Sequence, residues 1–204
     1  MKKITIGICC LVLIALMAST YAAINAVQDP QPPADTLNPS EISLAVDLSI
    51  DEMTANSDLI AIGSCLNTQS MWVDRTLVTL ANISVQEVLK GEDSSTITVA
   101  LPGGVDANRK IPIAMTYPGA PRITPDEKVF LFLVRDDMVR GGYTIAGFSQ
   151  GKFSIQKDDD GQDVVSRDLT ETALKGKTGV HRGGPTHTSL SGLKNQVLRQ
   201  LRTR

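Results

Sequence analysis

Residues 129–134 read VFLFLV, six apolar side chains in succession. Such a run has no polar face, so it predicts a strand that is buried on both faces. Each fully buried side chain of this kind contributes about 1.5 to 3 kcal/mol, and the ordering of the backbone offsets most of that gain. We therefore expect this strand to lie in the middle of a sheet.

Strands are also predicted on both sides of this run. Residues 76–89 are rich in β-branched side chains. Their apolar positions change phase partway, which predicts a β-bulge near Ala81 and Asn82. Asp158 to Gly161 read DDDG, which predicts the turn of a hairpin. Further strands are expected at residues 59–66, 96–101, 143–148, 153–155 and from residue 164 onward.

Two helices are predicted at the ends of this stretch. Ser49 and Glu52 have the spacing of a capping box, which predicts a helix of about two turns. Near the C-terminus, apolar residues recur at helical spacing from residue 190 to 201, and Ser189 or Ser191 is available as the N-cap. We expect this amphipathic helix to dock on the strands. A basic segment that touches anionic lipid or a partner is the alternative.

Together these elements predict a mainly β fold. We expect an OB-like antiparallel β-barrel with a short N-terminal helix and a C-terminal amphipathic helix, preceded by a signal peptide. The expected boundaries are residues 1–26 for the signal peptide, 27–45 for a Pro-rich tether, 46–168 for the barrel, 169–187 for a Gly-rich linker and 188–204 for the C-terminal helix.

The N-terminus has the pattern of an export signal. Lys2 and Lys3 precede an apolar run at residues 4–18, which is shorter than the roughly 20 residues that span a bilayer core. We expect cleavage between Ala26 and Val27, with the position after Ala22 as an alternative. The mature protein is then periplasmic or secreted and has no stable membrane insertion. An uncleaved N-terminal membrane anchor is the alternative location.

The charge balance and the cysteines limit the class of protein further. The chain has 20 basic and 22 acidic residues, and the expected signal removes two lysines and no acid. This acidic balance disfavours a nucleic-acid partner. Cys9 and Cys10 would leave with the signal, so Cys65 stands alone in the mature chain. Stability is expected to come from an apolar core, because no intramolecular disulfide is possible.

Several segments together resemble a family of uncharacterised exported bacterial domains over about residues 46–168. The first part of the resemblance is also similar to the OB-type barrels of netrin modules and tissue metalloproteinase inhibitors. Those inhibitors act through an N-terminal cysteine that this chain lacks, so the likeness implies a fold and no activity. Asp126 stands where the first family more often has glycine. The segments are SDLIAIG at 57–63, VQEVLKG at 85–91, LPGG at 101–104, GAPRITPDEKVFLFL at 119–133 and GFSQGKF at 147–153.

Residues 147–151 spell G-x-S-x-G, the nucleophile elbow of α/β-hydrolases. Ser149 would be the nucleophile of a triad with Asp168 and His187, and Asp163 and His181 are alternative partners. An elbow requires a helix after the serine, whereas this chain continues with an alternating, strand-like sequence. We therefore favour an ordinary strand in which Gly151 marks a bulge, and keep the serine hydrolase as the alternative.

No metal site or cofactor is predicted. The two histidines, His181 and His187, lie in a Gly-rich stretch that supplies no third ligand. The acidic residues 158–160 do not have the spacing of a calcium loop and are expected at a solvated hairpin tip.

Four polar or aromatic residues are candidates for binding. Arg122, Gln150 and Lys152 either line a groove or pair structurally with Glu127 or Asp126. A separate candidate is the single tryptophan, Trp72, which is expected in a loop, either as an interface anchor or packed over one end of the barrel.

The expected function is a non-catalytic binding or interaction module in the cell envelope. Its partner would be an envelope protein or a small ligand. The two alternatives are the serine hydrolase with Ser149 and a membrane-anchored protein with a structural role in the envelope.

Overall fold

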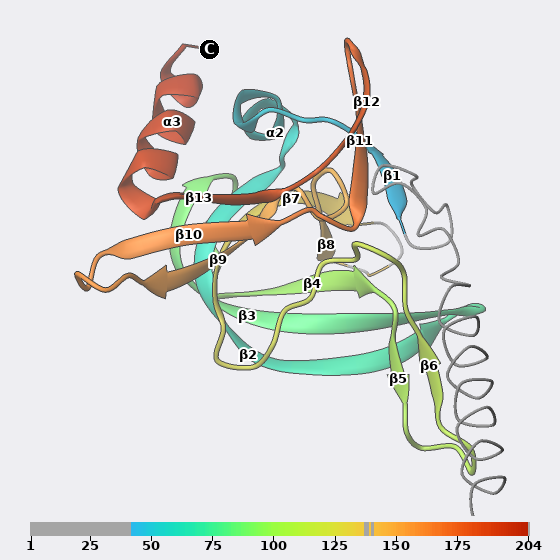
Figure 1. Ribbon diagram of the computed structural model, residues 1–204. Coiled ribbons are helices and arrows are strands. Elements are labelled where there is room, and N and C mark those ends of the chain that lie inside the picture. Colours follow the sequence, from blue (N-terminus) through green and yellow to red (C-terminus); the bar gives the residue numbers. More distant parts are fainter. Residues whose placement is uncertain (1–41, 137–138, 140, 204) are drawn as a thin grey trace, which may run out of the picture. The chain divides into compact units, whose positions relative to one another are not determined.

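The chain is mainly β in the computed structural model, which describes residues 42–136, 139 and 141–203 (Figure 1). The expected signal peptide, the cleavage site at Ala26 and Val27 and most of the expected tether lie outside these residues. The helices are α2 (Ile50–Asn56) and α3 (Leu190–Arg202). The strands are β1 (Ser43–Val46), β2 (Leu59–Val73), β3 (Thr76–Lys90), β4 (Thr96–Pro102), β5 (Gly104–Asp106), β6 (Ile113–Met115), β7 (Lys128–Asp136), β8 (Gly142–Ile145), β9 (Lys152–Lys157), β10 (Asp163–Asp168), β11 (Thr172–Gly176), β12 (Gly179–Arg182) and β13 (Pro185–Ser189).

β7 contains the VFLFLV run and is buried on both faces, as predicted. Val129, Leu131 and Leu133 enter one core cluster, and Phe130 and Phe132 enter the other. β2 pairs with one edge of β7, and β8 and β9 share the other edge. β7 is therefore the central strand of an eight-stranded sheet.

Part of this sheet closes on itself. β7, β2, β3, β4 and β8 pair in succession, and β8 pairs again with β7, so these five strands form a partly closed ring. The contact between β4 and β8 is parallel, and the other contacts in the ring are antiparallel. β9, β10 and β13 continue the sheet beyond β7.

The irregular pairing of β2 and β3 differs from the predicted bulge. The register skips Leu66 on β2, opposite Asn82 and Ile83, and skips Gln86 and Leu89 on β3. The residue without a cross-strand partner near Asn82 therefore belongs to the neighbouring strand. A phase change in one strand cannot identify which of two paired strands holds the extra residue.

Local signals for helices and turns are confirmed. Ser49 and Glu52 form the reciprocal capping box of α2, and Ser189 caps α3. Gly161 adopts a positive φ of 76° in the turn between β9 and β10, where DDDG predicted a hairpin. α3 docks on the strands, because Leu193 and Val197 are buried in the cluster that contains Phe130 and Phe132.

Residues 169–187, expected as a linker, form β11, β12 and most of β13. β11 pairs in parallel with β1, β12 pairs with β11, and β13 pairs with β10. The side chains of β12 and β13 are exposed, so these strands have no apolar periodicity. Pairing through the backbone with distant segments makes this stretch part of the folded unit. Among the described residues, no helix has both the length and the apolar character to cross a membrane.

We predict that Leu131→Asp abolishes cooperative unfolding. The Leu131 side chain is 1% exposed in an apolar cluster between β2 and β9, where an added carboxylate has no access to solvent. Lys152, the cation opposite it on β9, is already paired with Glu127. Circular dichroism during heating is the measurement. Ile111→Asp is the matched control, because Ile111 is 78% exposed, and it should melt as wild type does. A wild-type melt for Leu131→Asp would contradict the position assigned to β7.

Candidate functional site

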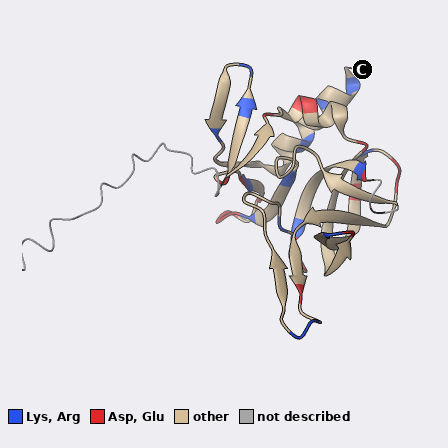
Figure 2. Ribbon diagram, turned by 90° about the vertical axis from the view of Figure 1, so that its right-hand side faces the viewer, with Lys and Arg blue, Asp and Glu red and all other residues tan. Residues whose placement is uncertain are grey.

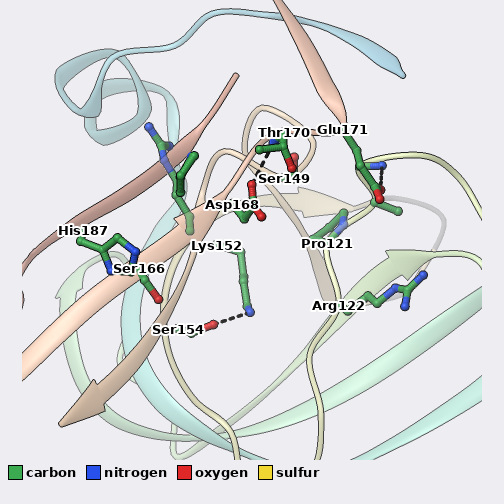
Figure 3. Close-up of a pocket in the computed structure, with 14 residues that line it drawn as sticks. Pro121, Arg122, Ser149, Lys152, Ser154, Ser166, Asp168, Thr170, Glu171 and His187 are labelled. Carbon is green, nitrogen blue, oxygen red and sulfur yellow. Dashed lines mark hydrogen bonds between the residues drawn. The ribbon is translucent and has the colours of Figure 1, made fainter. Parts of the chain in front are cut away.

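A pocket of about 510 Å³ lies over one face of β9, β10 and β13 (Figure 3). Ser154, Ser166 and His187 are neighbours across these three strands, so their side chains share a face. Lys152 lies two residues before Ser154 in β9, and Asp168 lies two residues after Ser166 in β10, so both side chains point to the same face. The floor of the pocket is therefore polar, with hydroxyl, ammonium, carboxylate and imidazole groups.

The wall of the pocket comes from loops. Residues 119–122, which precede β7, form one side, and Ser149, Thr170 and Glu171 lie at the top of the view in Figure 3. The carboxylate of Glu171 accepts a hydrogen bond from the N–H of Gly119 at 2.9 Å. Gly119 has a φ of 64°, which suits glycine, and a Cβ there would lie 2.5 Å from the hydroxyl of Thr172.

The G-x-S-x-G segment is a turn between two strands. It leaves β8 and enters β9, so no helix follows the serine. Phe148 has a φ of 67° within this turn. Gly151 is required by close packing, because a Cβ would lie 2.9 Å from the carbonyl oxygens of both Ala146 and Phe132. The expected strand through residue 148, with a bulge at Gly151, is therefore wrong: β8 ends at Ile145, and Gly151 is the last residue of the turn before β9.

The three residues of the hydrolase alternative line the same pocket. Ser149 is buried, and its hydroxyl lies 3.5 Å from the hydroxyl of Thr172. Asp168 accepts a hydrogen bond from the N–H of Thr170 at 2.9 Å, and His187 is exposed. In the described part of the chain, no hydrogen bond connects the serine with the aspartate or the histidine. The pocket thus holds the residue types of a triad without the proton relay.

The other two residues considered for the triad lie outside the pocket lining. Asp163 pairs with Lys157 at 3.0 Å, next to the hairpin turn that follows β9. His181 lies in β12, with its ring nitrogen 3.7 Å from the carboxylate of Asp47.

Lys152 is held by a half-buried ion pair on the pocket floor. Its ammonium group lies 2.5 Å from the carboxylate of Glu127 and 2.7 Å from the hydroxyl of Ser154, which also donates to Glu127. Burial raises the pKa of Glu127, but hydrogen bonds from Lys152, the Thr124 N–H and Ser154 bring the pKa below its ordinary value. Lys152 thus pairs with Glu127, one of the two roles considered for it, and it also lines the pocket.

Gln150 is a structural residue, and it does not line this pocket. Its side chain is fully buried, and the amide nitrogen donates to the carbonyl oxygens of Val46 at 2.7 Å and Gly147 at 3.1 Å. The amide oxygen accepts from the N–H of Leu48 at 2.9 Å. Gln150 therefore ties the segment between β1 and α2 to the turn before β9.

Trp72 lies in strand β2, whereas a loop was expected, and it is remote from the pocket lining. Its indole N–H donates to Asp106 at 2.7 Å, and the guanidinium of Arg109 lies 5.1 Å from the ring. Arg109 and Lys110 make the tip of the β5–β6 hairpin basic (Figure 2). The ring is thus half-buried and packs against this hairpin.

The pocket also contains residues that the sequence motifs did not indicate. Ser154 and Ser166 occupy alternate positions of β9 and β10, opposite the buried side chains of these strands. The period-2 pattern was the available signal for them. No local signal was present for Thr170 and Glu171, which enter the lining from a turn. Arg122 lines the pocket, which was one of the two roles considered for it, and its side chain is exposed.

We predict that Gln150→Glu destabilises the fold by at least about 2 kcal/mol. The replacement turns a buried donor into an oxygen that faces two carbonyl groups. Urea unfolding should detect the loss, and Gln156→Glu, at an exposed position of β9, should change stability little. Equal stability of the two variants would refute the structural role of Gln150.

The lowered pKa of Glu127 predicts a pH dependence of stability. The stability that ionised Glu127 contributes is fully present above the ordinary pKa of 4.5. It is lost as the pH falls through the lower pKa of the folded state. Glu127→Gln should therefore be less stable than wild type at neutral pH and should lose less stability below pH 4.5. The measurement is the free energy of unfolding at a series of pH values. Parallel curves for the two proteins would contradict the prediction.

Comparisons with known proteins do not assign this chain to a family. No family model, no curated protein and no solved structure matches it.

Proposed function

We propose that the protein is an exported, non-catalytic binding module of the cell envelope, with its ligand in the pocket over β9, β10 and β13. The observation that most supports this proposal is the polar floor of the pocket. It is formed by Lys152, Ser154, Ser166, Asp168 and His187. Concave sites with a few convergent polar groups are typical of ligand binding. Lys152 is locked in an ion pair, and Ser149 has no base within hydrogen-bonding distance among the described residues, which favours binding over catalysis.

The proposal includes the type of barrel. Five strands in a partly closed ring, with a sheet that continues beyond them, agree with an OB-type barrel, which is five-stranded and partly open. The resemblance to exported bacterial domains and to the netrin type of OB barrel supports the same proposal. The basic and apolar pattern of residues 2–18 supports export, with the processed protein in the periplasm or the medium.

A serine hydrolase is the second candidate, because Ser149, Asp168 and His187 line one pocket. The two functions differ in whether Ser149 is an activated nucleophile. A fluorophosphonate probe labels only such a serine.

We expect no fluorophosphonate labelling of the purified protein at neutral pH. Ser149→Ala is the matched variant, and mass spectrometry of the intact protein is the measurement. An adduct on wild type that disappears in Ser149→Ala would overturn the binding-module proposal in favour of the hydrolase. Absence of an adduct in both proteins supports the binding module.

A further inference from the structure

A second pocket, of about 320 Å³, adjoins the first one. Ala120, Pro121 and Arg122 line both pockets, so one short segment separates them. Figure 3 places Pro121 and Arg122 at the side of the first pocket opposite His187. The aliphatic, proline and methionine residues that line the second pocket are Leu101, Pro102, Val105, Met115, Ala120, Pro121 and Ile123.

The two pockets differ in chemistry. Hydroxyl and charged groups form the floor of the first, whereas aliphatic and proline side chains from β4, β5, β6 and residues 120–123 dominate the second. An apolar group gains free energy when it leaves water for such a surface, and a polar group loses free energy there unless it is hydrogen-bonded. A ligand that fills both pockets must therefore have a polar end and an apolar end.

Arg122 supplies the charge at the boundary. The other charged residues of the first pocket have partners. Lys152 binds Glu127, while Asp168 and Glu171 accept hydrogen bonds from backbone N–H groups. The guanidinium of Arg167 donates to the carbonyl oxygen of Gln150 and lies over the Phe153 ring. In the part of the chain that the structure describes, no hydrogen bond or ion pair occupies the guanidinium of Arg122. A guanidinium presents parallel donors that suit a carboxylate or a phosphate group.

The segment that carries Arg122 is fixed on both sides. Pro121 precedes it with a restricted φ, and Ile123 follows it as a buried member of the core. Upstream, the N–H of Gly119 is bound by Glu171, and the hydroxyl of Ser43 donates to the carbonyl oxygen of Pro118. The backbone beside Arg122 is thus preorganised, which reduces the conformational entropy lost when a ligand binds there.

We propose that the ligand of this site is a small amphipathic anion that crosses residues 120–122. Its hydroxyl-bearing polar group occupies the first pocket, its carboxylate or phosphate group binds Arg122, and its apolar chain occupies the second pocket. This inference rests on the proposed binding function, because it identifies the class of ligand for the same site.

Isothermal titration calorimetry with one probe and three comparison compounds tests the proposal. The probe is 1-octanoyl-sn-glycero-3-phosphoglycerol, used below its micelle concentration. Monooctanoylglycerol lacks the phosphate, and glycerophosphoglycerol lacks the chain. We expect saturable binding of the complete probe at one site, and binding at least about tenfold weaker for each of the two fragments. A free carboxylate source, N-octanoylglycine, shows whether the anion must be a phosphate.

Three variants assign the contacts. Arg122→Gln should weaken binding of the probe about tenfold and leave binding of monooctanoylglycerol unchanged. Val105→Asp should weaken both compounds that carry a chain, since Val105 lines the apolar pocket from an exposed position. Arg75→Gln removes an exposed guanidinium outside both pocket linings and should bind as wild type does.

Absence of saturable binding, equal affinity for the neutral lipid, or equal losses in Arg122→Gln and Arg75→Gln would each overturn the proposed ligand class. These binding results do not depend on whether a fluorophosphonate labels Ser149. Failure of this inference is therefore distinguishable from failure of the binding-module proposal, which only such an adduct overturns.

Discussion

β8 and β9 pair with the same edge of β7, and the turn that connects them positions the rest of the sheet. β9 pairs with Val129–Leu131, and β8 pairs with the residues from Leu133 onward. Phe132 lies between these two stretches and bonds to both ends of the turn. Its carbonyl oxygen accepts a hydrogen bond from the N–H of Ala146, and its N–H donates to the carbonyl oxygen of Gly151. The turn between these two points is so close to β7 that only glycine fits at Gly151. One turn thereby closes the ring on one side and starts the β9–β10 extension on the other.

The same extension contributes to the core and to the pocket, because alternate side chains of a strand point to opposite faces. Phe153 and Val165 pack in the aromatic cluster beneath α2 and α3. Arg167 lies on that face as well, 4.7 Å over the Phe153 ring, where burial lowers its pKa. Ser154 and Ser166 point to the opposite face. Core packing therefore orients the pocket floor. A change of register by one residue would exchange the core-facing and the pocket-facing side chains.

The predictions that held have a local physical cause. The apolar run of β7, the capping box at Ser49 and the turn at Gly161 each depend on residues within a few positions of one another. The predictions that differed depend on a partner strand. The extra residue opposite Asn82 is Leu66 on β2, and the expected linker becomes strands because β11 pairs with β1. Backbone hydrogen bonds to distant segments leave no periodic trace in exposed strands.

Of the candidate site, the sequence was enough to identify Arg122 and Lys152 as polar residues within the segments that carry the family resemblance. Only the folded chain separates their roles, because Lys152 meets Glu127 from a distant loop while Arg122 stays at the boundary of two pockets. Gln150 has the same local pattern, but its neighbours in space are backbone groups of the β1–α2 segment. Periodicity reports which residues are buried or exposed. The partner of a polar side chain is set by which distant segments pack beside it, and this is decided by tertiary structure.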